Sequence, residues 1–169
     1  WERMFPNYIS SEAVLASENT FFQEHHAKQE GFELTMHPFC RNTVAAMDWG
    51  GTIMNRYMSR DNKSRHRRYT SDVFEMAAAI VNQASVQCIA MYPNNLQELP
   101  QHEIDFLKSV PTTWDETRFI DGYPGKYVVI ARRHGSKWYV AALNGTNKPI
   151  TLNLSLPMLT GSEVNLYYE

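Results

Sequence analysis

Two glutamates near the start of the sequence, Glu12 and Glu18, are the first residues whose type and spacing suggest chemistry. A carboxyl group can act as a general acid or base, and carboxylates are preferred ligands of hard cations such as Ca²⁺. On a straight helix, six residues of separation would leave the two side chains about 120° apart around the axis. A shared site therefore requires a loop or a break in the helix between them.

A histidine pair, His25 and His26, suggests metal binding because Glu24 and Glu30 are close in the sequence. On a helix, Glu30 would share the face of His26, which precedes it by four residues. Zinc sites, however, use three or four ligands at definite spacing, and the sequence contains no H-E-x-x-H motif. We therefore favour a structural or surface role for the pair.

A run of basic residues occupies positions 63–68 (KSRHRR) and is the strongest local cluster of charge. Binding of phosphate or nucleic acid is one interpretation of such a run. No aromatic residue interrupts it, however, and the formal net charge of the chain is −2. Proteins that bind single-stranded nucleic acid combine positive charge with aromatic stacking platforms. We interpret the run as a solvated loop and expect no nucleic-acid partner.

The composition is that of a globular protein, with 43% hydrophobic and 20% charged residues among 169. No apolar run approaches the roughly 20 residues that cross a bilayer, so we expect no membrane span. The two cysteines, Cys40 and Cys88, are too few for a disulfide scaffold. Their apolar neighbours predict that both are buried free thiols.

The character of the sequence changes near residue 110, and this change predicts two regions. Residues 1–110 indicate helices and loops, whereas residues 111–169 alternate apolar and polar positions between turns that contain Gly or Pro. The fold class expected is therefore α/β followed by all-β. Helices are predicted over residues 12–30, 71–91 and 101–110, the second with a capping box formed by Asp72 and Glu75. Antiparallel strands are predicted at residues 117–121, 126–133, 137–143, 150–156 and 164–168.

Five segments, in this order and spacing, resemble glycoside hydrolase family 97. The first is residues 5–12 (FPNYISSE), with Glu18 six residues further on. The likeness extends through nearly the whole chain, and its most specific part is the pair of segments nearest the C-terminus. The remaining segments are residues 36–41 (MHPFCR), 47–48 (MD), 111–118 (PTTWDETR) and 125–133 (GKYVVIARR).

The resemblance implies the end of a (β/α)₈ barrel, residues 1–110, followed by an antiparallel β-sheet or sandwich domain, residues 111–169. It implies a calcium-dependent enzyme that cleaves α-glycosidic bonds, of the α-glucosidase or α-galactosidase type. By position, Glu18 matches the general acid, which also binds Ca²⁺, and Glu12 matches a second calcium ligand. Both would follow a barrel strand, on the face where such barrels carry their active sites.

The resemblance also implies which parts lie elsewhere. We expect an N-terminal portion of the same enzyme to supply the base or nucleophile and the remaining calcium ligands, so that this chain alone is inactive. The expected partners are this portion and an oligosaccharide or α-glycoside substrate, and the expected location is periplasmic or secreted. The family usually has T-R-E-G and G-Q-E around its two glutamates, whereas this sequence has SSEA at residues 10–13 and ASE at residues 16–18.

A second hypothesis is a non-catalytic carbohydrate-binding or scaffolding module. Trp138, Tyr139 and Tyr123 lie in the predicted β region, and exposed aromatic rings there could stack on sugars. The alternative for these rings is packing in the core or at the sheet edge, which we favour.

Overall fold

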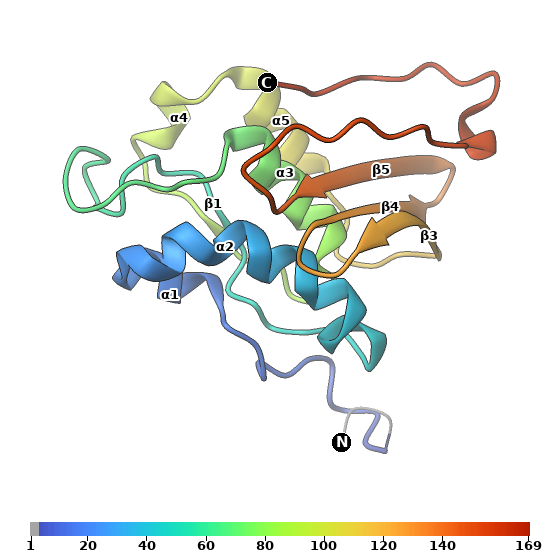
Figure 1. The fold of residues 1–169 in the computed structure, drawn as a ribbon, viewed down its shortest axis with the longest axis horizontal. Coiled ribbons are helices and arrows are strands. Elements are labelled where there is room, and N and C mark those ends of the chain that lie inside the picture. The colour runs from blue at the N-terminus through green and yellow to red at the C-terminus, as the bar shows by residue number, and fades with distance from the viewer. Residues whose placement is uncertain (1–3) are drawn as a thin grey trace.

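Helix α3 (Asp72–Val81) lies at the centre of a computed structural model that describes residues 4–169. Its N-cap is Ser71, whose side-chain oxygen accepts a hydrogen bond from the backbone N–H of Phe74 at 3.1 Å. Asp72 and Glu75 place negative charge in the first turn, where the helix dipole is positive. The later residues are apolar and mostly buried, so the helix is covered by other elements on several sides (Figure 1).

The prediction for this helix is wrong in its cap and its length. Ser71, not Asp72, caps it, and it ends at Val81 instead of residue 91. Residues 89–90 form a strand, β2 (Ile89–Ala90). The periodic apolar pattern continues beyond the helix because buried loop and strand residues are apolar too, and periodicity alone cannot separate short buried segments of either type.

The first region contains two short parallel pairings, and in each of them the two paired segments are connected by a stretch of chain that contains helices. Strand β1 (Thr52–Ile53) pairs in parallel with β2, and α3 is part of the connection between them. The backbone N–H of Thr52 donates to the carbonyl of Cys88 at 3.1 Å. An isolated parallel bridge joins Ser11 to Met47. Parallel strands with helical connections are the arrangement of α/β proteins.

The predicted helix over residues 12–30 is two helices. Helix α1 (Ser17–Phe22) and helix α2 (Glu24–Met36) are separated by Gln23, whose backbone is extended. Gly31 lies within α2 and packs against Gly145, where a Cβ on Gly145 would lie 2.6 Å from the carbonyl oxygen of Gly31. Two 3₁₀ turns follow, η1 (His37–Phe39) and η2 (Arg41–Thr43).

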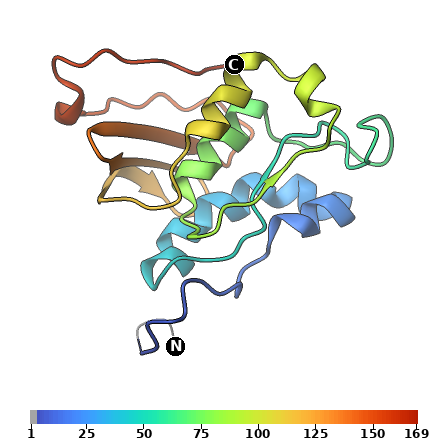
Figure 2. The ribbon, with the colours of Figure 1, turned by 180° about the vertical axis from the view of Figure 1, so that it is seen from behind.

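Two short helices complete the first region. Helix α4 (Asn95–Glu98) was not predicted, whereas helix α5 (Gln101–Ser109) matches the prediction and ends shortly before Pro111. Seen from behind, α5 lies over α3 (Figure 2). Leu107 of α5 packs there with Met76 of α3 in a small buried cluster.

An antiparallel sheet of three strands follows, in the order β3-β4-β5, as the turn pattern predicted. The strands are β3 (Glu116–Tyr123), β4 (Tyr127–His134) and β5 (Lys137–Asn144). The β3–β4 register shifts between Phe119 and Asp121, where a bulge bends the edge strand. Within the described residues the β region is this single sheet, backed by α3, and not a sandwich of two sheets.

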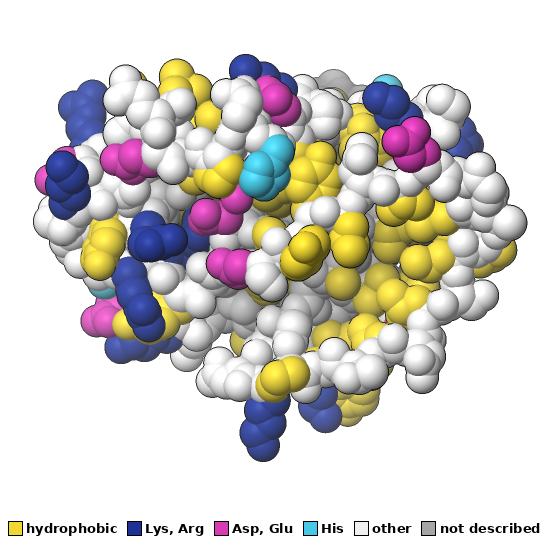
Figure 3. Space-filling model, turned by 90° about the horizontal axis from the view of Figure 1, so that it is seen from above, with side chains coloured by type: hydrophobic (Ala, Val, Ile, Leu, Met, Phe, Trp, Pro, Cys, Tyr) yellow, Lys and Arg dark blue, Asp and Glu magenta, His cyan; other side chains and the backbone are white. Residues whose placement is uncertain are grey.

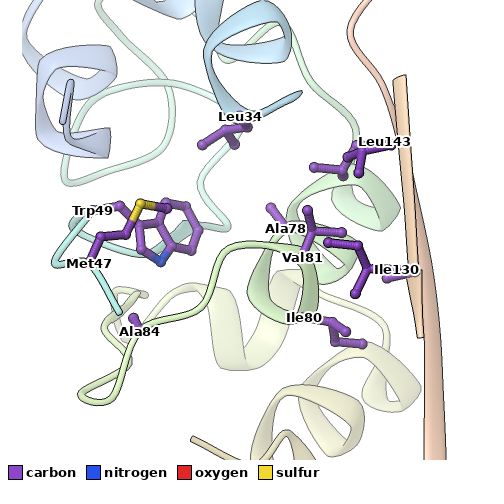
Figure 4. Close-up of a cluster of buried hydrophobic side chains, with 11 residues drawn as sticks. Leu34, Met47, Trp49, Ala78, Ile80, Val81, Ala84, Ile130 and Leu143 are labelled. Atoms are coloured by element: carbon purple, nitrogen blue, oxygen red, sulfur yellow. The ribbon is translucent and has the colours of Figure 1, made fainter. Parts of the chain in front are cut away.

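One buried cluster joins all these parts. Figure 4 shows Trp49 and Met47 on one side of α3, and Ile130 and Leu143 of the sheet on the other. Their close packing fixes the sheet relative to the segment that follows the Ser11–Met47 bridge.

The strands predicted at residues 150–156 and 164–168 are absent. After β5 the chain is extended, makes the 3₁₀ turn η3 (Pro157–Leu159), and runs back across the molecule (Figure 1). Its apolar residues alternate, but the described residues provide no neighbouring strand that pairs with it. Alternation identifies a segment fit for a sheet, whereas strand formation also requires a partner with matching register.

Two smaller expectations have different outcomes. Both cysteines are free, as predicted, but both are exposed, because Cys40 follows a short 3₁₀ turn and Cys88 precedes β2 at the surface. None of the helices within residues 4–169 is long and apolar enough to cross a membrane.

Gly51 provides a test of the parallel pairing. Its φ is +88°, and a Cβ there would lie 1.7 Å from the backbone oxygen of Cys88. We expect Gly51→Ala to lower the free energy of unfolding by about 3 kcal/mol or more, from backbone strain and the forced separation of β1 from β2. The matched control is Gly135→Ala, which has positive φ but no atom within 4 Å and should cost about 1 kcal/mol. Equal losses in urea denaturation would contradict the close approach.

Candidate active site

Glu18 lies in the first turn of α1, at an exposed position. The N-cap residue, Ala16, has no side-chain group that can cap the helix. Instead the backbone N–H of Ser17 donates to the carbonyl of Trp49 at 2.6 Å. Because Trp49 is only 1% exposed, this contact fixes the start of α1, and with it Glu18, to the core.

Gly50 brings the chain close to the Glu18 carboxylate. A Cβ at Gly50 would lie 2.5 Å from Oε2 of Glu18 and 2.7 Å from Oγ of Ser17. The φ of Gly50 is +81°, a conformation that side chains other than that of Gly rarely adopt. A Gly-Gly pair is typical of a loop, but the link of Gly50 to Glu18 arises only in the fold.

Glu18 lines an open cavity of about 680 Å³. Volumes of this size are typical of small-molecule sites. Asp48 and Asn55 are its other main polar side chains, and apolar strand residues such as Ile53 and Ile89 line it as well. Its aromatic side chains are Phe21, Phe22 and Tyr92.

Asn55 and Tyr92 are site residues that the sequence did not single out, and Asp48 was noted only as part of the segment 47–48 of the family resemblance. Asp48 follows Met47, the residue of the parallel bridge, so it stands where a strand ends. Asn55 is 1% exposed and donates its side-chain N–H to the carbonyl of Ser59 at 2.8 Å, while its Oδ1 has no hydrogen-bond partner among the described residues. A buried amide oxygen of this kind is available to a hydroxyl group brought close to it.

Glu12 is placed differently from Glu18. It is exposed and directly follows Ser11, whose carbonyl accepts hydrogen bonds from the backbone N–H of Asp48 and the side chain of Arg41. An irregular segment separates it from α1, so the break that a shared site requires is present. Glu12 is not, however, one of the residues that line the cavity.

No group of three or more His, Cys, Asp or Glu side chains in the described part of the chain is arranged to hold a metal ion. The histidine pair therefore does not form a metal centre within these residues; the His25 and His26 rings lie 4.0 Å apart. Ca²⁺ takes six to eight oxygen ligands. Two exposed carboxylates, those of Glu12 and Glu18, have suitable oxygen donors and fit as part of such a set.

The aromatic residues of the β region are mostly engaged in packing. The Trp138 ring is covered by the Arg118 guanidinium at 4.7 Å, and the Tyr139 ring packs edge-on against Trp114 at 5.4 Å. Tyr123 is exposed, with the Lys126 ammonium 4.4 Å from its ring centre. These contacts favour the packing interpretation over a sugar-binding surface.

Near α1, a buried charged cluster connects α2, α3 and residues 66–70. Arg68 donates to the carbonyl of Ile53 at 2.7 Å and forms an ion pair with Asp72. Glu75, which is fully buried, accepts from the backbone N–H of Ile53 at 3.1 Å. Burial raises the pKa of Glu75, and burial together with the nearby Glu75 charge raises the pKa of Glu30 well above its usual value.

Comparison with known proteins was made against family models, curated proteins and solved structures. Residues 113–169 match the model described as glycosyl-hydrolase 97 C-terminal, oligomerisation. A probable retaining alpha-galactosidase of Streptomyces bingchenggensis is 27% identical over 161 residues, which are 95% of this chain and 22% of that protein. A retaining alpha-galactosidase of Bacteroides thetaiotaomicron is 28% identical over 145 residues, which are 83% of this chain and 22% of that protein.

The chain is also similar to solved structures of glycoside hydrolases. The crystal structure of a beta-arabinopyranosidase has a TM-score of 0.92 and 52% identity, covering 96% of this chain and 26% of that one. A glycoside hydrolase family 97 enzyme from Pseudoalteromonas sp. strain K8, in complex with acarbose, has a TM-score of 0.69 and 22% identity, covering 83% of this chain and 22% of that one. At the latter identity the likeness shows the fold alone.

The relatives that this chain matches are glycoside hydrolases. More narrowly, the match of residues 113–169 to the C-terminal model of glycoside hydrolase family 97 confirms the resemblance of the motifs to that family. The chain spans only about a quarter of the length of these relatives, between 22% and 26%.

The buried Glu30 carboxyl provides a pH test of the cluster beside α1. Its raised pKa means that the folded state retains a proton that the unfolded state releases above about pH 4.5. The free energy of unfolding should therefore fall as pH rises above that value, and Glu30→Gln should remove this loss. We expect the variant to gain stability over the wild type as pH rises above 4.5, measured by thermal unfolding.

The control for this test is Glu33→Gln, a half-buried position on the same helix. A stability difference between Glu30→Gln and the wild type that does not change with pH would contradict the raised pKa.

Proposed function

We propose that this chain is the C-terminal part of a glycoside hydrolase in which Glu18 is the general acid. The observation that carries the proposal is the position of Glu18 on a 680 Å³ cavity, where Gly50 and the Ser17–Trp49 hydrogen bond fix the start of its helix. Glycosidic cleavage requires one carboxyl group of the enzyme that gives a proton to the leaving oxygen. It also requires a second carboxylate of the enzyme on the other side of the scissile bond.

We further propose that residues 1–110 are the last part of a (β/α)₈ barrel. Two features support this: parallel pairing with helical connections, at β1–β2 and at the Ser11–Met47 bridge, and a cavity lined by residues that follow these segments. Active sites of such barrels lie at the carboxyl ends of the strands. The remaining strands and the nucleophile or base would come from the N-terminal portion of the enzyme.

The proposed substrate is a glycoside whose sugar has the ring configuration of α-galactose. Two relatives are named retaining alpha-galactosidases, and the structure with 52% identity is a beta-arabinopyranosidase. The L-arabinopyranose ring carries the hydroxyl arrangement of D-galactose without the exocyclic carbon, so one site can accept both. An α-glucosidase activity has less support from the relatives. We also propose the retaining mechanism, in which the second carboxylate is a nucleophile about 5–5.5 Å from the acid.

Within the cavity, Asp48 and Asn55 are proposed to orient the sugar. The carboxylate of Asp48 can accept hydrogen bonds from ring hydroxyls, and the unpartnered Oδ1 of Asn55 can accept another. Such fixed polar groups in an otherwise apolar cavity determine orientation and specificity.

Calcium remains part of the proposal. Glu12 and Glu18 would hold the ion together with ligands of the N-terminal portion, and bound Ca²⁺ would supply positive charge beside the sugar. Glu18 would stay within reach of the leaving oxygen as the proton donor. A periplasmic or secreted location is likewise proposed from the resemblance.

Substitution of Glu18 tests the assignment of the acid. In the full-length enzyme, Glu18→Gln should reduce kcat/KM about 100- to 10,000-fold on a disaccharide substrate, because the leaving oxygen lacks its proton donor. The reduction should be smaller on 4-nitrophenyl α-galactoside or β-L-arabinopyranoside, since nitrophenolate leaves without protonation. Glu163→Gln, an exposed position near the C-terminus, is the control. Wild-type rates for Glu18→Gln on both substrates would exclude the role.

Removal of calcium tests the metal proposal. We expect a chelator to abolish activity of the full-length enzyme and added Ca²⁺ to restore it. Glu12→Gln should raise the Ca²⁺ concentration needed for half of full activity by about tenfold or more, because one charged ligand is lost. Activity that persists after exhaustive chelation would refute the calcium requirement.

A further inference from the structure

Residues 56–69, which we call the basic loop, carry five exposed cations. None of the five forms an ion pair with a carboxylate within residues 4–169. In Figure 3, Lys and Arg side chains gather at the left end, where this loop lies in Figure 1. The formal net charge of the chain is −2, so this is a local concentration of positive charge. The five residues are Arg56, Arg60, Lys63, Arg65 and Arg67.

The basic loop is held in one shape by its own hydrogen bonds. Ser59 Oγ donates to Asp61 at 2.6 Å and accepts from the backbone N–H groups of Lys63 and Ser64 at 3.2 and 3.0 Å. Asn62 Oδ1 accepts from the backbone N–H of Tyr57 at 2.8 Å. A loop ordered in advance loses less entropy when its side chains bind a ligand.

Arg65 connects this loop to the helix that carries Glu18. Its guanidinium lies 5.4 Å from the centre of the Phe21 ring and donates to the carbonyl of Phe22 at 3.3 Å. Phe21 and Phe22 line the same cavity as Glu18, and they are three and four residues further along α1. At 1.5 Å per residue, the basic loop therefore reaches the helix about 6 Å from the level of the Glu18 backbone. It borders the cavity.

Arg65 has a conformation that suits recognition of an anion. Its φ is +64°, which is uncommon for a residue other than Gly. The guanidinium lies over the Phe21 ring, and one of its terminal nitrogens donates to the Phe22 carbonyl. The other N–H groups remain for a carboxylate, which a guanidinium binds through two parallel hydrogen bonds. Phe22, whose carbonyl accepts this hydrogen bond, is 63% exposed, and its side chain offers an apolar surface to a sugar ring.

We propose that Arg65 and the basic loop bind the carboxylate of a uronic acid in the glycan from which the enzyme removes its sugar. This inference rests on the proposed function and extends it, because it names the neighbouring sugar that forms the leaving group. A uronic acid presents a sugar ring and a carboxylate together, which matches the exposed side chain of Phe22, a residue whose backbone carbonyl is bound by the Arg65 guanidinium. Nucleic acid matches less well, because a chain of net negative charge gives no broad field to hold a long polyanion.

The kinetic test uses two disaccharides that differ only at one carbon. In both, the galactose-configured sugar is linked to a second sugar, glucuronic acid in one and glucose in the other. We expect the full-length enzyme to have a KM about tenfold lower for the acidic substrate, with similar kcat, because a charge-assisted contact is gained. Arg65→Gln should remove this preference and leave the neutral substrate unaffected. Arg65→Lys should restore part of it, since charge returns without the paired N–H geometry.

Lys137→Gln is the control, because Lys137 is an exposed cation at the β4–β5 turn. Equal KM values for the two substrates in the wild type, or a preference that survives Arg65→Gln and Arg67→Gln, would overturn the inference. If neither disaccharide nor an aryl glycoside is cleaved, it is the proposed function that fails.

A binding measurement decides the uronic-acid contact independently of catalysis. In affinity electrophoresis the full-length protein should be retarded by polygalacturonate but not by neutral galactan, and Arg65→Gln should reduce the retardation. Equal retardation by dextran sulfate or by DNA would indicate a general polyanion surface and overturn the proposal.

Discussion

The structure depends on the burial of α3 between the three-stranded sheet and the chain around Trp49. Apolar residues of α3 pack against the sheet and against Trp49. One buried guanidinium also joins the sheet to α3. Arg132 of β4 is 3% exposed and donates to the carbonyl of Val81 at 3.1 Å, at the end of α3, and to Thr117 at 2.8 Å. Burial lowers the pKa of Arg132 to about 10, so it stays charged near neutral pH and its loss would leave buried acceptors without a donor.

Turn and alternation patterns in the sequence predicted the elements whose residues interact mainly with near neighbours along the chain. The β3–β4–β5 sheet follows the sequence closely because its turns join neighbouring strands. The segment at residues 150–156 has an equally clear alternation and forms no strand, because its partner would have to come from elsewhere. The strand β2 depends on pairing with the distant strand β1, which propensity and periodicity do not record.

In the candidate site, too, the sequence did not reveal the features that depend on contacts between distant segments. Glu18 was singled out by the family resemblance, and spacing alone would have left it among ordinary surface glutamates. Asn55 and Gly50 were not recognised, because the unpartnered Asn55 oxygen and the approach of Gly50 to Glu18 arise only when residues far apart in the sequence come together. The basic run was judged to lack aromatic neighbours along the chain, yet Phe21, more than forty residues earlier, lies under Arg65.

The core that surrounds α3 contains residues from both sides of the change in composition near residue 110. Leu34, Trp49 and Val81 from before that position share one cluster with Ile130 and Leu143 from after it. A volume change on one side of such a cluster has to be matched on the other, because interiors of this density leave no spare room. The two regions are therefore not free to diverge separately: a family member that acquired its β-domain from a different lineage would inherit a mismatched core. In evolutionary terms we expect substitutions in the core of residues 1–110 and in the sheet to change together.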